Sequence, residues 1–228
     1  MKLKRAEEIK EAYRTLGGAH SFCDGMMTGT TAPGRWILRH VWQMTREDAL
    51  EYQSRAFSAI PTGFSGKLLE VPVGTGVLSM PVFQTISDAE IVCLDYSAKM
   101  MMAAERRAKE FSIQNVTFQQ GDVGNLPFSD EHFDIVVSLN GFHAFPDKEA
   151  AYREVFRVLK PGGVFCGCFY VEGENRRTDW CIQRFYIRAG FFTPPFETAE
   201  SLRKRLKNQY TQADVGTVQS IAYFQCVK

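Results

Sequence analysis

Residues 68–76 read Leu-Leu-Glu-Val-Pro-Val-Gly-Thr-Gly, a short apolar run that passes directly into a turn with two glycines. The run is typical of a buried strand, and we expect a helix after the turn. Ligands of open α/β sheets bind where parallel strands end. Two glycines let a ligand approach the backbone without a Cβ clash, and the amides that open a helix favour a carboxylate or phosphate. The stretch therefore predicts a strand that delivers a ligand-binding turn.

The sequence after this turn alternates short apolar runs with longer amphipathic stretches, the pattern of strand-helix units in a parallel sheet. The predicted strands are Lys67–Val73, Glu90–Asp95, Val116–Gln120, Phe133–Asn140 and Gly163–Val171. Helical spacing of apolar residues predicts helices over Ser97–Phe111 and Asp147–Leu159, each able to lay one face on the sheet. Lys160-Pro-Gly-Gly163 is expected to end the second helix and turn the chain into the fifth strand.

The two ends of the chain lack the alternating strand-helix pattern. Helices are predicted over Asp179–Phe191 and Glu197–Asn208, and two antiparallel edge strands are predicted within Tyr210–Val227, around Gly216. Before the first strand, the sequence predicts helices over Lys4–Leu16, Arg35–Met44 and Arg46–Ile60, and a glycine-rich loop over Gly17–Gly34 that can open and close over the site. Residues 1–66 therefore read as a helical cover, or lid, on one domain of residues 67–228, which carries a helical insertion at about 173–208.

Composition narrows the possible partners. The chain of 228 residues has 27 Lys and Arg against 26 Asp and Glu, a net charge of +1, which gives no overall attraction to nucleic acid. No window approaches the roughly 18 apolar residues of a spanning helix, so stable membrane insertion is not expected. Six cysteines without a C-x-x-C pair suit a reducing cytoplasm and predict no metal site. A homodimer is left open.

Acidic residues follow the second and third predicted strands. Asp95 ends the second strand, 19 residues after Gly76, where a carboxylate can accept hydrogen bonds from both hydroxyls of a ribose. The third strand runs into Gly121-Asp122. The alternative for Asp95 is a cap at the start of the following helix. A nicotinamide dinucleotide fingerprint would need glycine at position 79, where this chain has Ser79, and this disfavours an oxidoreductase.

Taken in order, these motifs resemble the class I S-adenosylmethionine-dependent methyltransferases, particularly the type 11 domain and the menaquinone/ubiquinone-biosynthesis C-methyltransferases. The resemblance spans about residues 67–171. It is carried by Glu70-Val-Pro-Val-Gly-Thr-Gly76, Asp95-Tyr-Ser-Ala-Lys-Met-Met101, Gly121-Asp-Val-Gly-Asn-Leu-Pro-Phe128, Phe133-Asp134, His143-Ala-Phe-Pro-Asp147 and Arg157-Val-Leu-Lys-Pro-Gly-Gly163. It implies a Rossmann-like, mostly parallel seven-stranded sheet with an antiparallel last strand.

The resemblance also implies S-adenosylmethionine as the cofactor. Glu70 and the Gly74-Thr75-Gly76 turn would hold its methionine end, Asp95 its ribose, and Asp122 with the Val123 amide its adenine. Asn140 and Gly141 would line the reacting end. The full set of residues expected at the cofactor is Glu70, Val71, Pro72, Gly74, Thr75, Gly76, Asp95, Tyr96, Met100, Gly121, Asp122, Val123, Asn140 and Gly141.

Pro72 departs from the family pattern, which usually has the first glycine of the turn at this position. Proline fixes φ near −65° and removes an amide donor, so we expect a stiffer turn that does not use this N–H to hold a ligand. If that amide were needed, the chain would be a non-catalytic binder of S-adenosylmethionine.

The sulfonium cofactor is already a strong electrophile, so positioning and water exclusion supply most of the acceleration. His143 is the best-placed candidate for a general base, with an alternative role of orienting the loop beside the cofactor. The acceptor is expected to be a small apolar or aromatic molecule, because many large side chains flank the predicted site. They are Phe22, Met26, Met27, Trp36, Trp42 and Tyr52 in the cover, and Trp180, Phe185, Tyr186, Phe191, Phe192, Pro194, Pro195 and Phe196 in the insertion.

Overall fold

In the computed structural model, residues 24, 25 and 27–228 are described; the expected helix over Lys4–Leu16 lies outside them. The sheet strands are β1 (Lys67–Glu70), β2 (Glu90–Asp95), β3 (Val116–Gln120), β4 (Phe133–Leu139), β5 (Leu159–Tyr170), β6 (Gln212–Val218) and β7 (Ile221–Val227). The helices are α3 (Ala32–His40), α4 (Arg46–Phe57), α5 (Met80–Phe83), α6 (Ala98–Glu110), α7 (Lys148–Val158), α8 (Arg176–Cys181) and α9 (Ala199–Gln209), with a π-helical turn, η1 (Ile182–Tyr186), after α8.

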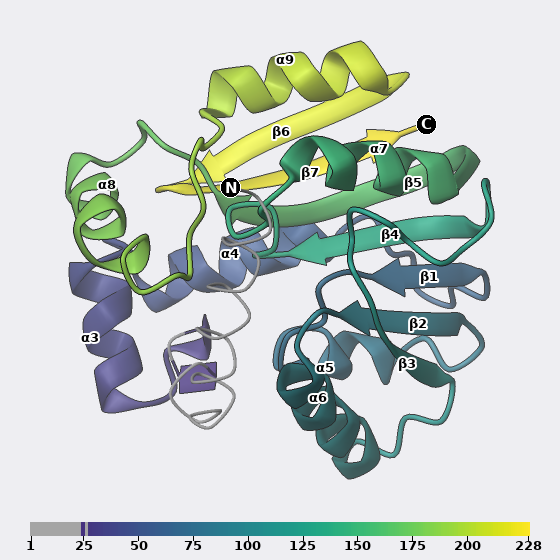
Figure 1. Ribbon diagram of the computed structural model, residues 1–228. Helices are drawn as coiled ribbons and strands as arrows, with labels where there is room; N and C mark the ends of the chain where they lie inside the picture. Colours follow the sequence, from purple (N-terminus) through teal and green to yellow (C-terminus); the bar gives the residue numbers. More distant parts are fainter. Residues whose placement is uncertain (1–23, 26) are drawn as a thin grey trace.

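The seven strands form one sheet in the order β3-β2-β1-β4-β5-β7-β6. Strands β1 to β5 pair in parallel, and β7 runs antiparallel to both β5 and β6. Figure 1 shows this sheet crossing the molecule, with β3 at one edge and β6 at the other. The expected Rossmann-like sheet with an antiparallel last strand is confirmed.

Alternating side chains of each parallel strand enter two separate cores, because successive residues of a strand point to opposite faces. Leu68 packs in the core that contains α4, α5 and α6, and the neighbouring Leu69 packs in the core beneath α7 and α9. Helices therefore cover both faces, which explains why these strands are continuous apolar runs rather than alternating ones.

Several predicted boundaries differ from the structure. Strand β1 ends at Glu70 rather than Val73. Strand β5 begins at Leu159, so the residues of the predicted Lys160–Gly163 turn belong to this strand, where its pairing with β4 shifts register beside Phe133. The C-terminal hairpin turns at Gln219 and Ser220, not at Gly216. Gly216 lies within β6, where a Cβ would collide with the Tyr223 ring of β7.

The helix boundaries also shift. Helix α3 spans Ala32–His40 instead of Arg35–Met44, because Thr31 caps its first turn and Pro33 lies within it. The helix predicted over Asp179–Phe191 begins earlier, at Arg176, where the Asn175 side chain accepts from two backbone amides. Capping side chains thus fix starts that apolar periodicity alone places a few residues too late.

Gly167 controls the contact between the central strands β4 and β5. It has a φ of 154°, and a Cβ there would overlap the Ser138 carbonyl group. We predict that Gly167→Ala lowers the free energy of unfolding by about 1–3 kcal/mol or more through overpacking, measured by urea denaturation. Gly162→Ala is the matched control, because Gly162 also has a positive φ, 76°, but has open space around it. An equal loss in both variants would contradict a packing role for Gly167.

Candidate functional site

A cavity of about 350 Å³ lies at the carboxyl ends of β1, β2, β3 and β4, where ligands of such sheets bind. It is lined by the predicted residues Glu70, Val71, Pro72, Gly74, Thr75, Gly76, Asp95, Tyr96, Met100, Gly121, Asp122, Val123, Asn140 and His143. Gly141 is the exception. A Cβ at Gly141 would collide with Pro72 and Phe145, so this glycine serves the packing behind the turn.

The turn after β1 presents bare backbone to this cavity. Gly74 and Gly76 have φ values of 56° and 69°, which glycine adopts readily. No atom lies within 4 Å of the place where a Gly74 Cβ would be. The missing amide of Pro72 costs no bond to the sheet, since Val71 donates to Val137 and Val73 donates to Leu94. The residues on either side of the proline therefore bind the turn to β4 and to β2.

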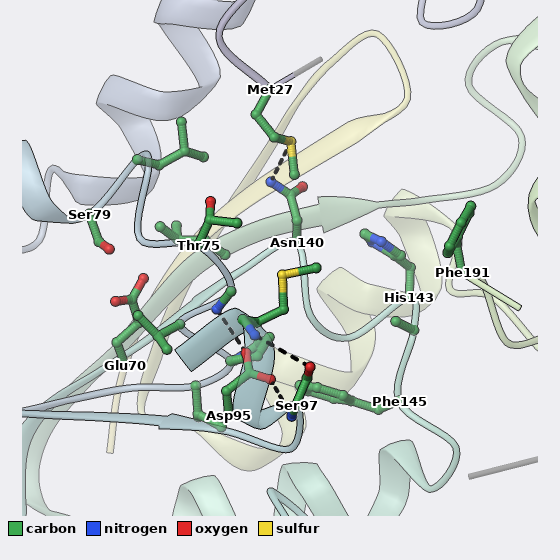
Figure 2. Close-up of a pocket in the computed structure, with 18 of the residues that line it drawn as sticks. Met27, Glu70, Thr75, Ser79, Asp95, Ser97, Asn140, His143, Phe145 and Phe191 are labelled. Atoms are coloured by element: carbon green, nitrogen blue, oxygen red, sulfur yellow. Dashed lines mark hydrogen bonds between the residues drawn. The ribbon is translucent and has the colours of Figure 1, made fainter. Parts of the chain in front are cut away.

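Asp95 joins this turn to the end of β2. One carboxylate oxygen accepts from the Gly74 amide at 2.8 Å, and the other accepts from the Ser97 amide at 2.7 Å (Figure 2). Ser97 in turn caps α6. Burial raises the pKa of Asp95 to about 6. The helix cap weighed as the alternative for Asp95 is therefore Ser97, and Asp95 holds the turn and the Ser97 amide instead. Because each carboxylate oxygen has two lone pairs, Asp95 can still accept bonds from a ligand in the cavity.

Glu70 is an acid buried in the cavity wall. Its side chain is 1% exposed, and no lysine or arginine in the described part of the chain pairs with it. The Cys93 thiol donates to Oε2 at 3.7 Å. Burial raises the pKa of this carboxyl to about 8, so at neutral pH it is mainly protonated. Figure 2 shows the Ser79 hydroxyl on the same side of the cavity, buried and without a hydrogen-bond partner in the part of the chain that the structure describes.

Asp24, which precedes the first strand, also contacts the glycine turn after β1. Asp24 forms an ion pair with Arg107 of α6 at 2.6 Å and accepts a hydrogen bond from the Thr75 hydroxyl at 2.6 Å. Arg107 also donates to the Thr75 carbonyl. The sequence alone does not indicate this role of Asp24, since a single acid 51 residues before Thr75 carries no local signal.

Asp122 and Asn140 occupy opposite parts of the rim. Asp122 is exposed and accepts from the Gly124 amide at 2.8 Å, while the neighbouring Val123 is buried. Asn140, at the end of β4, has a φ of 54°, an uncommon conformation that asparagine tolerates. Its amide points toward the Met27 sulfur at 3.8 Å (Figure 2).

The far end of the cavity is apolar and comes from the cover and the insertion. Among its residues, Met27, Trp42, Tyr52, Tyr186, Phe191 and Phe192 were expected there, and Leu38, Met44 and Ile221 were not. Three other expected residues, Trp36, Trp180 and Phe185, are more than half exposed and point away. Phe22 and Met26 lie outside the described residues. Apolar character alone did not distinguish inward from outward side chains.

The described helices include none long and apolar enough to cross a membrane. Residues 24, 25 and 27–228 also contain no group of three His, Cys, Asp or Glu side chains arranged to hold a metal ion.

The comparisons with known proteins agree with this geometry. Residues 68–163 match the protein family described as "Methyltransferase domain". The ubiquinone/menaquinone biosynthesis C-methyltransferase of Pseudomonas savastanoi is 28% identical over 162 residues, 70% of this chain and 57% of that protein. The chain therefore spans little more than half of this curated relative.

Solved structures share the fold over more of the chain. A methyltransferase from Thermotoga maritima, described as a possible histamine N-methyltransferase, has a TM-score of 0.62 at 19% identity, covering 85% of this chain and 93% of that one. The [4+2]-cyclase SpnF has a TM-score of 0.70 at 17% identity, covering 96% and 95%.

Residues 68–163 thus match a methyltransferase domain, and the sheet has the fold of solved methyltransferase structures. Among curated proteins, the chain is similar to the ubiquinone/menaquinone C-methyltransferases. The predicted resemblance is confirmed.

The residues present fit S-adenosylmethionine. Its ammonium and sulfonium groups are cations, and Glu70 offers a buried carboxyl that no Lys or Arg of the described residues pairs with. Among the same residues, the Ser79 hydroxyl has no hydrogen-bond partner and the space over Gly74 is open, and a ligand with polar groups would fill both.

The raised pKa of Glu70 has a consequence for stability. Between its ordinary value of 4.5 and about 8, the folded protein holds a proton that the unfolded chain has lost, so rising pH favours unfolding. We expect the free energy of unfolding of the wild type to fall by up to about 1.4 kcal/mol between pH 6.5 and 7.5, a window above the pKa of Asp95. We predict that Glu70→Gln abolishes this fall.

Urea denaturation at both pH values measures this difference. Glu90→Gln is the matched control, because Glu90 is an exposed acid at the other end of the neighbouring strand. Identical pH dependence in the wild type and Glu70→Gln would show that the Glu70 carboxyl is not held neutral.

Proposed function

We propose that the protein is an S-adenosylmethionine-dependent methyltransferase whose acceptor is a small apolar or aromatic molecule. One observation carries the proposal. The glycine turn, Asp95 and Asp122 meet at the polar end of a cavity whose other end is lined by aromatic side chains. A polar nucleoside and an apolar acceptor can thus share one enclosed space, with the rim of β4 between them.

The described side chains provide binding and exclusion of water. The cofactor supplies an electrophilic methyl group when it is bound. Asp95 would bind the ribose, the Gly74–Gly76 turn and Glu70 would hold the methionine part, and Val123 with Asp122 would border the adenine. Leu38, Trp42 and Phe192 exclude water at the other end.

His143 is not suited to acid-base chemistry. Burial and the Lys148 ammonium lower the pKa of its imidazole from 6.5 to about 3. A group that is neutral throughout the physiological range and so weakly basic is a poor general base.

The name of the relative supports a quinone-type acceptor, and the aromatic lining is compatible with one. We place the activity in the cytoplasm, because the described cysteines are free buried thiols, as expected in a reducing compartment.

Titration calorimetry with S-adenosylmethionine, S-adenosylhomocysteine and NAD tests the proposal. We expect both sulfur compounds to bind and NAD not to bind. Transfer of a labelled methyl group to 1,4-naphthohydroquinone, followed in an organic extract, then tests for catalysis. Binding without transfer to any hydroquinone in a panel would favour a non-catalytic binder, and preference for NAD would exclude a methyltransferase.

Asp95→Ala tests the polar end of the cavity. We predict that cofactor binding weakens by about 1–3 kcal/mol, because the Gly74 and Ser97 amides lose their acceptor and the turn loosens. Calorimetry gives the dissociation constant, and a thermal melt confirms that the variant is folded. Asp88→Ala, which removes an exposed acid just before the same strand, is the control and should bind as the wild type does. An unchanged dissociation constant in Asp95→Ala would remove Asp95 from the site.

A further inference from the structure

His143 lies at the apolar end of the cavity, away from the acidic residues. Glu70 and Asp95 end β1 and β2, and Asp122 follows β3; these strands form one half of the sheet. His143 follows β4 and contacts β5 on the other half through the Tyr170 amide. Figure 2 shows its imidazole directed into the cavity between Asn140 and Phe191.

The imidazole is fixed from several sides. Its ring stacks on Phe192 with centroids 4.0 Å apart and an interplanar angle of 16°. The Tyr170 amide donates to Nδ1 at 3.3 Å. The backbone beside it is also held, because the Thr193 amide donates to the His143 carbonyl at 2.9 Å. The side chain is buried, with 7% of its surface exposed.

These contacts determine where the proton lies. A neutral imidazole has one N–H and one bare nitrogen, and Nδ1 is the bare one because it accepts from Tyr170. Nε2 therefore carries the hydrogen. No described protein atom accepts from it, and the nearby walls are the aromatic rings of Trp42, Phe191 and Phe192. The Nε2–H donor therefore faces the cavity, where a ligand that supplies an acceptor atom can bind it.

We propose that the His143 Nε2–H recognises the methyl acceptor by donating a hydrogen bond to an oxygen on an otherwise apolar ring. This inference rests on the proposed function, since it concerns the acceptor end of the same cavity. It selects carbonyl, phenolic or enol oxygens and disfavours ammonium groups, which offer no lone pair. His143 is then a specificity residue that holds the acceptor, and it takes no proton from it.

Three probes with the same bicyclic frame test this preference: 1-tetralone has a ketone oxygen, tetralin has no polar atom, and 1-aminotetralin is a cation. The chain has three tryptophans. Trp36→Phe with Trp180→Phe removes the two exposed ones and leaves Trp42, in the cavity wall, as the fluorescent reporter. The measured quantity is the ratio of the tetralin and tetralone dissociation constants.

We expect His143→Phe, which keeps a ring against Phe192, to reduce this ratio by about 3- to 10-fold, the range for one neutral hydrogen bond. His143→Gln keeps an N–H donor and should retain most of the ratio. Phe191→Leu is the matched control, because it alters the apolar wall and should weaken both probes equally. A ratio unchanged in His143→Phe, or 1-aminotetralin binding as tightly as 1-tetralone, would overturn the proposal.

A second measurement needs no variant. A long-range proton–nitrogen NMR spectrum of the wild type reports which imidazole nitrogen is protonated, and a proton on Nδ1 would also overturn the inference. Calorimetry with S-adenosylmethionine separates this test from the proposed function. If the probes behave as expected but the cofactor does not bind, the oxygen-binding position stands and the methyltransferase proposal fails.

Discussion

The carboxylate of Asp95 is the contact on which the site depends. It binds the Gly74 amide of the turn after β1 and the Ser97 amide before α6, and so fixes two strand ends and a helix start relative to one another. Buried backbone amides without an acceptor are costly, and an anionic acceptor forms the stronger bonds. The burial that strengthens these bonds also raises the pKa of Asp95 to about 6, which links the order of the turn to its ionisation.

The rest of the cavity follows from the switch in strand order between β1 and β4. The acidic residues lie at the ends of the strands on one side of this switch, and the apolar wall lies over the strands on the other side. On that side α4 packs on β5 and β7, and the segment between β5 and α9 contributes Tyr186 and Phe192 to the cavity. The cover also reaches the polar half, because Asp24 binds both Thr75 and Arg107. Ligand-binding turn and cover are therefore mechanically connected, and ordering one favours ordering the other.

Local sequence signals predicted what depends on local structure. Apolar runs gave seven strands, and the position of Asp95 after a strand placed it beside the glycine turn. Properties that depend on distant residues could not be predicted. Gly216 was predicted as a turn residue, but it is needed within β6 because the Tyr223 ring lies across the hairpin from it. Trp36 and Trp42 have the same apolar character, yet one is 60% exposed and the other lines the cavity. For His143, the tautomer depends on the Tyr170 amide, 27 residues away on β5, and the weak basicity depends first on burial, so neither property has a sequence signature.

The two ends of the cavity also differ in how they respond to pH. Glu70 and Asp95 change charge near pH 8 and pH 6, whereas His143 stays neutral over that whole range. A bound cation beside Glu70 would favour its charged form and release a proton, so pH effects between 6 and 8 belong to the cofactor end. The acceptor end recognises its ligand through shape and one fixed N–H. A shared fold does not fix chemistry, and a structural neighbour is a cyclase, so the proposed methyl transfer rests on the residues that meet in the cavity rather than on the fold.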